Sequence, residues 1–525
     1  MEKRDNITED NRQDRPSIFE KKRYIRSFSN RDFFKNIILA DNVYVNIDSA
    51  KEHYGNTNCI IGSKDEVYDY FIEPNILQMN MSFIIKDYDG RVLSEYGDIL
   101  KEKGYIVKSI NYMDTTNSLE YNVFDFLNYE EDVCDLVSMI TKSNFIGLTK
   151  GEKLLKNAEN LLLEAIIYYI MSELPYEEHN LNTVLRLLKL ARPISKLDEE
   201  YNSDMHLLFK MLEEKSEEKN IAVEKYKKFL EAAKHMEGII IEHIENYLSI
   251  YSMQSVRKIT NSNTLQLDDL FMAGKKVILL IVVPSSNPKY EYTADTFILL
   301  LTTYIKYMAD KRHCSKLPNK IHLICNNMIN NNLELLLKDA YKYNMFITLS
   351  IDNHEKLMDY YSNIYEIIDS CSAFICYNYK EEYIKEYIKY KVIEAVNLDT
   401  YSELEKLNEE EFNIDEFLEE YNEDSYIVFI QYSRPILGEI YDVEEHDNYI
   451  TKDVRINKYK LDELKDKVEN QIYRNLISEI DLNERSIKSK ENVDVDIGAK
   501  QLISDEIYSD LAMKLNKPLI NDVQD

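Results

Sequence analysis

Asn58–Gln78 reads NCIIGSKDEVYDYFIEPNILQ. The run Cys59–Ile61 is short and apolar, and it is followed directly by Gly62 and Ser63. A short apolar run bounded by turn-forming residues is typical of a buried strand. The later part, Val67–Gln78, is predicted to form a helix. The stretch therefore predicts a strand, a loop and a helix in that order.

Strand, loop and helix are also the frame of a phosphate-binding loop, G-x-x-x-x-G-K-[ST]. In such a loop the glycines let backbone N–H groups wrap the phosphates, the lysine meets the β and γ oxygens, and the hydroxyl holds Mg²⁺. Here the second glycine is missing, and the carboxylates of Asp65 and Glu66 are expected where phosphate would lie. Lys64, the only nearby cation, comes too early in the loop. The frame is present, but the groups that would hold a phosphate are not.

Alternating strand and helix patterns on both sides of a central helical region predict an α/β protein with a mostly parallel sheet. Partial alternation over Asn36–Asp48 predicts a hairpin before the first core strand. Lys276–Val283 is the strongest buried-strand candidate, because it is continuously apolar. The other expected strands are Ser82–Lys86, Tyr105–Ile110, Ile321–Cys325, Phe346–Ile351, Ala373–Tyr377 and, as the last, Tyr426–Gln431. The expected helices include Val92–Lys103 and Thr293–Asp310.

Composition and periodicity divide the chain into four parts. The apolar periodicity between about 131 and 256 is helical throughout, which indicates an all-helical insertion into the α/β core. Residues 397–424 are acidic and are predicted to form a solvated helix or linker. The predicted parts are a flexible charged arm (1–35), a discontinuous α/β core (36–130 and 257–450), the all-helical insertion (131–256) and a charged helical or disordered tail (451–525).

The charge balance opposes broad, nonspecific binding of DNA. The 525 residues carry a formal net charge of −30, and such binding requires many cations to neutralise phosphates. Direct DNA binding is therefore not expected of the chain as a whole, although a local basic patch is compatible with an acidic total.

Cysteine and histidine spacing predicts no metal site. The six cysteines form no C-x-x-C pair, and no histidine pair has the spacing of metal ligands. Cys59 and Cys325 lie in apolar runs and are expected to be small core residues. Reduced thiols, the lack of a signal-like N-terminus and the lack of an apolar run of about 18–20 residues favour a cytoplasmic protein, with partners as its route to the inner face of the membrane.

Several further stretches occur in an order and spacing that resemble a known family. They are Asn58–Gln78 with its ending EPNILQ, Ser82–Gly90, Lys103–Lys108, Ser118–Phe124, Ala232–Lys234, Arg434–Pro435 and Tyr441–Asp442. Together they resemble the TraG-like coupling proteins of conjugation and type IV secretion. These are hexameric ATPases of the additional-strand P-loop type that deliver DNA–relaxase complexes to the secretion channel. The resemblance spans roughly residues 36–450 and implies a P-loop NTPase-like (RecA-like) core.

The departures from the family fall at its catalytic positions. Aligned on the end of the first helix, Val67 takes the position of the phosphate-loop lysine and Tyr68 that of the Mg²⁺-binding hydroxyl. Asn326 would replace the Mg²⁺-ordering aspartate, and Asn327 the water-activating glutamate. An amide cannot take a proton from water at neutral pH and gives Mg²⁺ no counter-charge. The degenerate phosphate loop comprises Gly62, Ser63, Lys64, Asp65, Glu66, Val67 and Tyr68.

Two more positions of the family pattern have changed. The arginines that the family offers to a neighbouring site align with Tyr341 and Tyr343, and its γ-phosphate-sensing glutamine aligns with Asp352. The sequence therefore predicts no catalytic residue, no bound cofactor and no metal.

Bland interpretations compete with functional ones elsewhere. Asp87 and Asp89 are predicted to shape a strand-to-helix turn rather than to catalyse. His235 and His243 are predicted to be ordinary surface or packing residues. Tyrosine clusters such as Tyr360–Tyr361 could stack on bases, but packing explains them as well.

Three functions remain open. The leading hypothesis is a nucleotide-incompetent relative of the coupling ATPase, acting as an adaptor or structural subunit. Its partners would be conjugation or type IV secretion proteins or an intact coupling ATPase, in a homo- or hetero-oligomer. The alternative is an active ATPase that uses ATP and Mg²⁺ in an unusual site. The third is a decayed product, which the well-kept apolar strands oppose.

Overall fold

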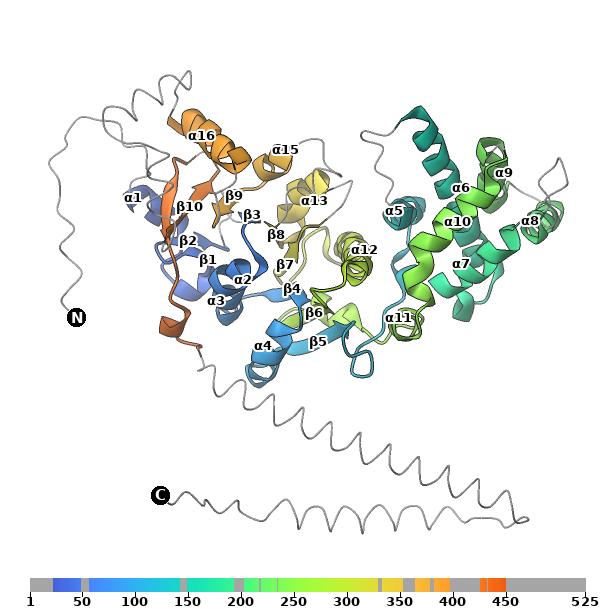
Figure 1. Cartoon of the computed structure of the whole chain (residues 1–525). Coiled ribbons are helices and arrows are strands. Elements are labelled where there is room, and N and C mark those ends of the chain that lie inside the picture. The colour runs from blue at the N-terminus through green and yellow to red at the C-terminus, as the bar shows by residue number, and fades with distance from the viewer. Residues whose placement is uncertain are drawn as a thin grey trace, which may run out of the picture. The chain divides into compact units, whose positions relative to one another are not determined.

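A computed structural model describes most of the chain between residues 22 and 449 (Figure 1). The described ranges are 22–48, 56–141, 149–192, 203–216, 219–233, 235–328, 333–352, 364–377, 382–396, 425–431 and 433–449. The predicted linker 397–424, the predicted tail 451–525 and the Tyr360–Tyr361 pair lie outside the described residues.

The core is a nine-stranded sheet in the order β11-β10-β9-β3-β8-β7-β4-β6-β5. The seven strands from β9 to β5 are parallel, and β10 and β11 are antiparallel. All seven residues of β6 are buried, as a central parallel strand with helices on both faces requires. The strands are β3 (Thr57–Ile61), β4 (Ser82–Tyr88), β5 (Ile106–Asn111), β6 (Val277–Val283), β7 (Ile321–Asn326), β8 (Met345–Ile351), β9 (Ala373–Cys376), β10 (Ser425–Ile430) and β11 (Ile436–Glu439).

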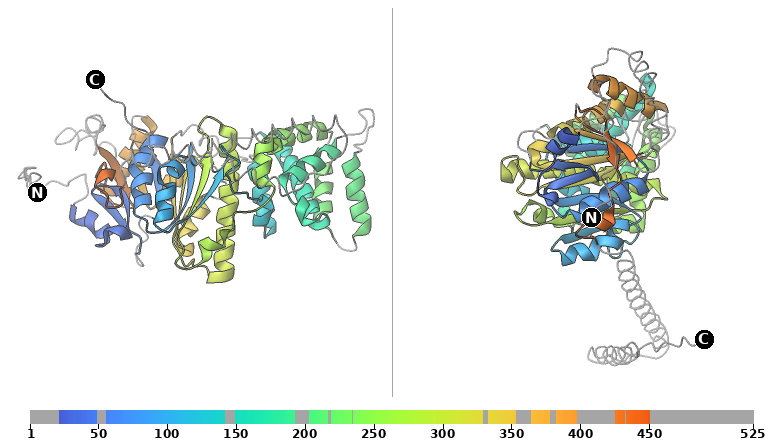
Figure 2. Two further views of the ribbon diagram at one scale, coloured as in Figure 1. Left: turned by 90° about the horizontal axis from the view of Figure 1, so that it is seen from below. Right: turned by 90° about the vertical axis from the view of Figure 1, so that its left-hand side faces the viewer.

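Helices cover both faces of this sheet (Figures 1 and 2). One face packs against the helical run α2 (Lys64–Val67), a π-helical turn (Tyr68–Ile72) and α3 (Glu73–Leu77), and against α4 (Arg91–Glu102). The opposite face packs against α12 (Pro288–His313), α13 (Leu333–Asp339), α15 (Ile364–Asp369) and α16 (Glu382–Val396). The predicted α/β class with a mostly parallel sheet is confirmed, and each of the expected sheet strands is present.

The region between β5 and β6 is helical, as predicted. Its buried side chains join those of α12 in one apolar cluster, which ties the helical region to the core. α6 lies against α9, and α5 contacts α12. The helices are α5 (Glu130–Thr141), α6 (Lys150–Glu173), α7 (Leu181–Leu188), α8 (Asp204–Lys215), α9 (Ile221–Ala233), α10 (Glu237–Leu248) and α11 (Gln254–Thr260).

Two predictions at the ends of the core need correction. Residues 22–35 belong to the predicted flexible arm, but they form α1 (Lys22–Ile25) and two short 3₁₀ turns that bury Ile25 and Phe28. Burial of these two apolar side chains gives the segment a reason to order. β10 is also not the last strand, because β11 follows it and completes a hairpin.

The N-terminal hairpin covers the β11 edge of the sheet. It consists of β1 (Asn36–Ala40) and β2 (Val43–Asn46), as the alternation predicted. The Asp41 N–H donates to the Glu439 carbonyl, and the Asn42 side chain donates to the Leu437 carbonyl. Covering an edge strand in this way removes a template for unwanted pairing.

Candidate nucleotide site

The connection between β3 and the following helix is short. β3 ends at Ile61 and α2 begins at Lys64, so only Gly62 and Ser63 link them. The helix was predicted from Val67 and in fact starts three residues earlier. Residues that would form a wide phosphate loop are therefore wound into the first helical turn.

A capping box closes the N-terminus of α2. The Glu66 N–H donates to the Ser63 hydroxyl at 3.2 Å, and the Ser63 N–H donates to the Glu66 carboxylate at 2.7 Å. Asp65 adds a second carboxylate to this turn. Helix N-termini attract anions because their N–H groups are free and their dipole end is positive. Here the protein's own carboxylates occupy that position.

Tyr377 closes the loop from the other side. It follows β9, its N–H donates to the Ile61 carbonyl, and its ring is buried against Gly62. A Cβ atom at Gly62 would lie 2.9 Å from the Tyr377 Cδ2 atom, so only glycine fits at this close approach.

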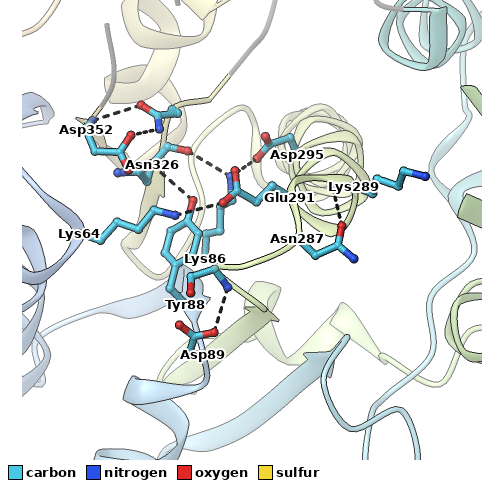
Figure 3. Close-up of polar contacts among 12 residues, drawn as sticks. Lys64, Lys86, Tyr88, Asp89, Asn287, Lys289, Glu291, Asp295, Asn326 and Asp352 are labelled. Carbon is cyan, nitrogen blue, oxygen red and sulfur yellow. Dashed lines mark hydrogen bonds and ion pairs between the residues drawn. The ribbon is translucent and has the colours of Figure 1, made fainter. Parts of the chain in front are cut away.

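Lys64 points away from the loop and toward α12 (Figure 3). Its ammonium lies 3.1 Å from the Glu291 carboxylate and 3.7 Å from the centre of the Tyr88 ring. The charge of Lys64 is therefore already paired within the protein.

A buried ion pair lies beneath the site, between β4 and α12. The Lys86 ammonium is 2.8 Å from Asp295, and the two side chains are 0% and 8% exposed. Lys86 also donates to the Asn326 carbonyl at 3.1 Å. Burial disfavours the ammonium charge, but attraction to Asp295 outweighs it and raises the pKa of Lys86. Lys86 therefore carries a full charge that is satisfied within the protein.

The two asparagines at the end of β7 are engaged with neighbours. The Asn326 side-chain oxygen accepts from the Tyr88 hydroxyl at 3.4 Å. Asn327, with φ of 46°, donates to the Asp352 carboxylate through its amide, and its side-chain oxygen accepts from the Asp352 N–H at 3.2 Å. Asn326, Asn327 and Asp352 thus lie at neighbouring strand ends, and Figure 3 labels Asn326 and Asp352 there.

Val67, Tyr341 and Tyr343 supply no groups to this site, whereas Tyr68 lines the cavity beside α2 and its hydroxyl donates to the Glu95 carboxylate at 3.2 Å. Val67 and Tyr68 are buried in the core. Tyr341 and Tyr343 precede β8, at the opposite end of the strand from Asp352, and the Tyr343 hydroxyl donates to a carboxylate of α12 at 3.1 Å.

Asp87, near the end of β4, and Asp89, just after it, shape the turn, as predicted. Asp87 accepts from the N–H groups of Val92 and Leu93, both at 2.9 Å, and so caps α4. Burial raises the pKa of Asp87 to about 7. Asp89 has φ of 54° and accepts from the Ser285 N–H.

A cavity of about 510 Å³ adjoins α2 on the β4 side. Its cations are all neutralised: Lys64 and Lys86 as described, and Arg91 by Asp69 at 2.6 Å. Within the described ranges, no group of three or more His, Cys, Asp or Glu side chains could hold a metal. Three carboxylates also line the cavity, those of Asp65, Asp87 and Asp89.

The fit to a nucleotide is therefore poor. A triphosphate with Mg²⁺ needs free N–H groups, a free cation and a metal-ordering carboxylate. At the end of β3 the first two are committed to internal partners, and at the end of β7 amides stand where carboxylates would be needed.

Residues 70–392 match the protein family described as type IV secretory system conjugative DNA transfer. The match covers more than half of the chain. The chain belongs to this family. The predicted resemblance to TraG-like coupling proteins is thereby confirmed. The comparison with curated proteins found no match.

Solved structures of coupling proteins share the fold. The bacterial conjugative coupling protein TrwBΔN70 in complex with sulphate has 10% sequence identity and a TM-score of 0.56, covering 83% of this chain and 95% of that one. The plasmid coupling protein TrwB with the GTP analogue GDPNP has 11% identity and a TM-score of 0.55, covering 82% and 94%. TrwB with ADP and Mg²⁺ has 10% identity and a TM-score of 0.54, covering 82% and 94%.

Sequence reasoning missed the ion pairs to α12. Neither the Lys86–Asp295 pair nor the contact of Lys64 with Glu291 was expected. A signal was available: Lys86 ends an apolar strand, and Asp295 lies two residues before the apolar run Phe297–Leu301 of a helix. Buried charges are rarely tolerated without a partner, so two such residues predict each other.

No described helix of this family member is both long and apolar enough to cross a membrane.

Proposed function

We propose that this chain is a nucleotide-incompetent relative of the coupling ATPases that acts as an adaptor or structural subunit in conjugative DNA transfer. The capping box between Ser63 and Glu66 carries the proposal. A phosphate arriving at α2 would have to break both hydrogen bonds and approach two carboxylates. Each of these effects opposes binding.

The end of β7 supports the same proposal. Asn326 and Asn327 offer neither a base for water nor a charge for Mg²⁺, and their side chains are engaged with Tyr88 and Asp352. Loss of the lysine and both carboxylates removes on the order of several kcal/mol of transition-state stabilisation.

One observation favours the alternative of an active ATPase with an unusual site. The Asp352 carboxylate lies beside Asn327 at the neighbouring strand end, so this edge of the sheet still carries one acidic group. That carboxylate already accepts a hydrogen bond from the Asn327 amide. Lys64 is paired with Glu291 of α12 and is therefore not available to bind a phosphate beside Asp352. We therefore favour the adaptor.

A thermal-shift titration separates the two. A ligand at about 100 times its Kd stabilises the native state by about 2.7 kcal/mol. We expect no shift of the melting temperature with ATP and Mg²⁺ beyond the shift given by Mg²⁺ with inorganic phosphate. A shift specific to ATP, lost in Asp352→Asn but kept in a partly exposed control such as Asp98→Asn, would establish the alternative.

The adaptor role has its own test. The purified chain is mixed with the intact coupling ATPase of the same mobile element, and particle masses are measured in solution. We expect a mixed complex whose formation does not depend on ATP. Separate particles at every concentration tested would contradict an adaptor that acts on that ATPase.

A further inference from the structure

The segment 22–35 is basic, although the protein as a whole is acidic. It contains five cations and a single carboxylate, that of Asp32, in a chain with a net charge of −30. One of the cations, Lys35, lies 3.2 Å from the Asp48 carboxylate. No ion pair joins the other four to any residue that the structure describes, and all four are exposed. They are Lys22, Arg23, Arg26 and Arg31.

These cations stand on a fixed support. Ile25 and Phe28 are buried in the same apolar cluster as the N-terminal hairpin, and the 3₁₀ turn that ends at Phe28 contacts β2 (Figure 1). The Asn36 side-chain amide donates to the carbonyls of Asn30 and Phe33, both at 3.1 Å. Packing and hydrogen bonds therefore hold the segment against the core.

Two aromatic side chains are exposed on the same segment. Tyr24 is 46% exposed and Phe34 is 36% exposed. The Tyr24 ring rests edge-on against Phe28, with 5.1 Å between the ring centres, and the Phe34 ring rests against Phe33 at 5.6 Å. Aromatic residues and arginine are enriched in protein–protein interfaces, whereas lysine is depleted. Three of the four unpaired cations here are arginines, so the composition is typical of a protein-binding surface.

We propose that this surface, the N-terminal basic surface, binds a carboxylate-rich segment of a partner protein. A guanidinium presents a planar fork of N–H groups that matches a carboxylate, and the exposed rings offer contacts for apolar side chains of the same segment. The inference rests on the proposed adaptor role for naming a protein as the ligand, and it adds the chemical character of that partner. The surface comprises Lys22, Arg23, Tyr24, Arg26, Arg31 and Phe34.

An anionic bilayer fits this surface less well, because acidic side chains border it. The centre of the Phe34 ring lies 6.0 Å from that of His446. Three exposed carboxylates adjoin this histidine in the chain, those of Glu444, Glu445 and Asp447. A broad anionic plane that reached Phe34 would also meet these carboxylates, and like charges repel within a Debye length. A narrow protein segment can contact the arginines without approaching them.

The test uses the full chain and a fluorescently labelled synthetic peptide in which glutamates flank a pair of leucines. Binding is read by anisotropy at several salt concentrations, beside a peptide with glutamine in place of every glutamate. The variant carries Arg23→Gln, Arg26→Gln and Arg31→Gln. Its matched control removes the same total charge from exposed lysines elsewhere, through Lys103→Gln, Lys153→Gln and Lys210→Gln. Melting temperatures of both are compared with that of the unmodified chain, to show that each variant is folded.

We expect the unmodified chain and the lysine control to bind the glutamate peptide. The arginine variant should bind it about tenfold or more weakly at low salt, since three exposed charge pairs are lost together. The difference should shrink as the salt concentration rises, because exposed charges are then screened. The glutamine peptide should not bind to any of the three proteins.

No binding of the glutamate peptide by the unmodified chain at low salt would overturn the proposal. Equal weakening in the arginine variant and the lysine control would also overturn it. Phosphatidylserine vesicles and a single-stranded oligonucleotide test the other anionic ligands: if the arginine variant loses only one of these and keeps the peptide, the proposal is wrong. None of these outcomes involves ATP, so the proposal can fail while an ATP titration still supports the lack of nucleotide binding.

Discussion

Replacement of Asp295 by asparagine should destabilise the protein strongly. The substitution keeps the size of the side chain but leaves the Lys86 ammonium, 0% exposed, without its counter-charge 2.8 Å away. Removing one partner of a buried ion pair costs about 3–5 kcal/mol, because the remaining charge stays out of water. The same change at Asp98, whose pair with Lys101 is 43% and 58% exposed, should cost about 0–1 kcal/mol.

Urea unfolding of the Asp295→Asn and Asp98→Asn variants, followed by far-UV circular dichroism, measures the difference. The expected result is a much larger fall in the midpoint for Asp295→Asn. The effect should also depend on pH in a defined direction. Without Asp295, burial lowers the pKa of Lys86 below its unfolded value of about 10.4, so the native state loses a proton that the unfolded state keeps.

The sign of that pH effect follows from linkage. Below pH of about 10.4 the unfolded state binds the proton more tightly, so the variant loses stability as the pH falls and regains part of it near pH 10. A double variant, Lys86→Met with Asp295→Leu, should recover much of the loss. Equally small losses of stability in Asp295→Asn and Asp98→Asn would refute the reasoning, because they would show that water reaches and solvates the Lys86 ammonium.

Three further outcomes are expected. Burial lowers the pKa of His322 to about 3. Between pH 6.5 and 5 only the unfolded state therefore takes up a proton on this histidine, so the free energy of unfolding should fall by about 2 kcal/mol over that range. The His322→Gln variant should flatten this part of a plot of urea midpoint against pH. Gly62→Ala should cost about 1–3 kcal/mol in the same assay, because its Cβ atom would press on the Tyr377 ring; Gly151→Ala, with open space around it, should not destabilise. Ser63→Ala should cost about 1 kcal/mol through loss of the capping box, and an unchanged melting temperature would argue against that cap.

The sheet was predictable because its strands carry local signals. β6 is seven apolar residues in a row, and β2 of the N-terminal hairpin alternates between buried and half-buried residues. The early start of α2 was also readable, since Ser63 and Glu66 form the spacing of a capping box. Against the phosphate-loop pattern these positions lack the second glycine and the lysine, but they do encode the start of a helix.

The contacts that fill the site were less predictable, because they join residues far apart in sequence. Lys86 meets Asp295 across 209 positions, and Lys64 meets Glu291 across 227. Local patterns do not specify which strand end faces which helix. Ile25 and Phe28 also pack onto the core, although they lie in a charged segment whose sequence gives no sign of this.

The most direct test of the account is an equilibrium titration of labelled ATP, with Mg²⁺ in excess, against the purified chain. The account predicts no saturable binding at protein concentrations up to the millimolar range, in the unmodified chain and in Lys64→Ala alike. Saturable micromolar binding that is weakened by Lys64→Ala would contradict it, because it would show that Lys64 leaves Glu291 to hold a phosphate at α2.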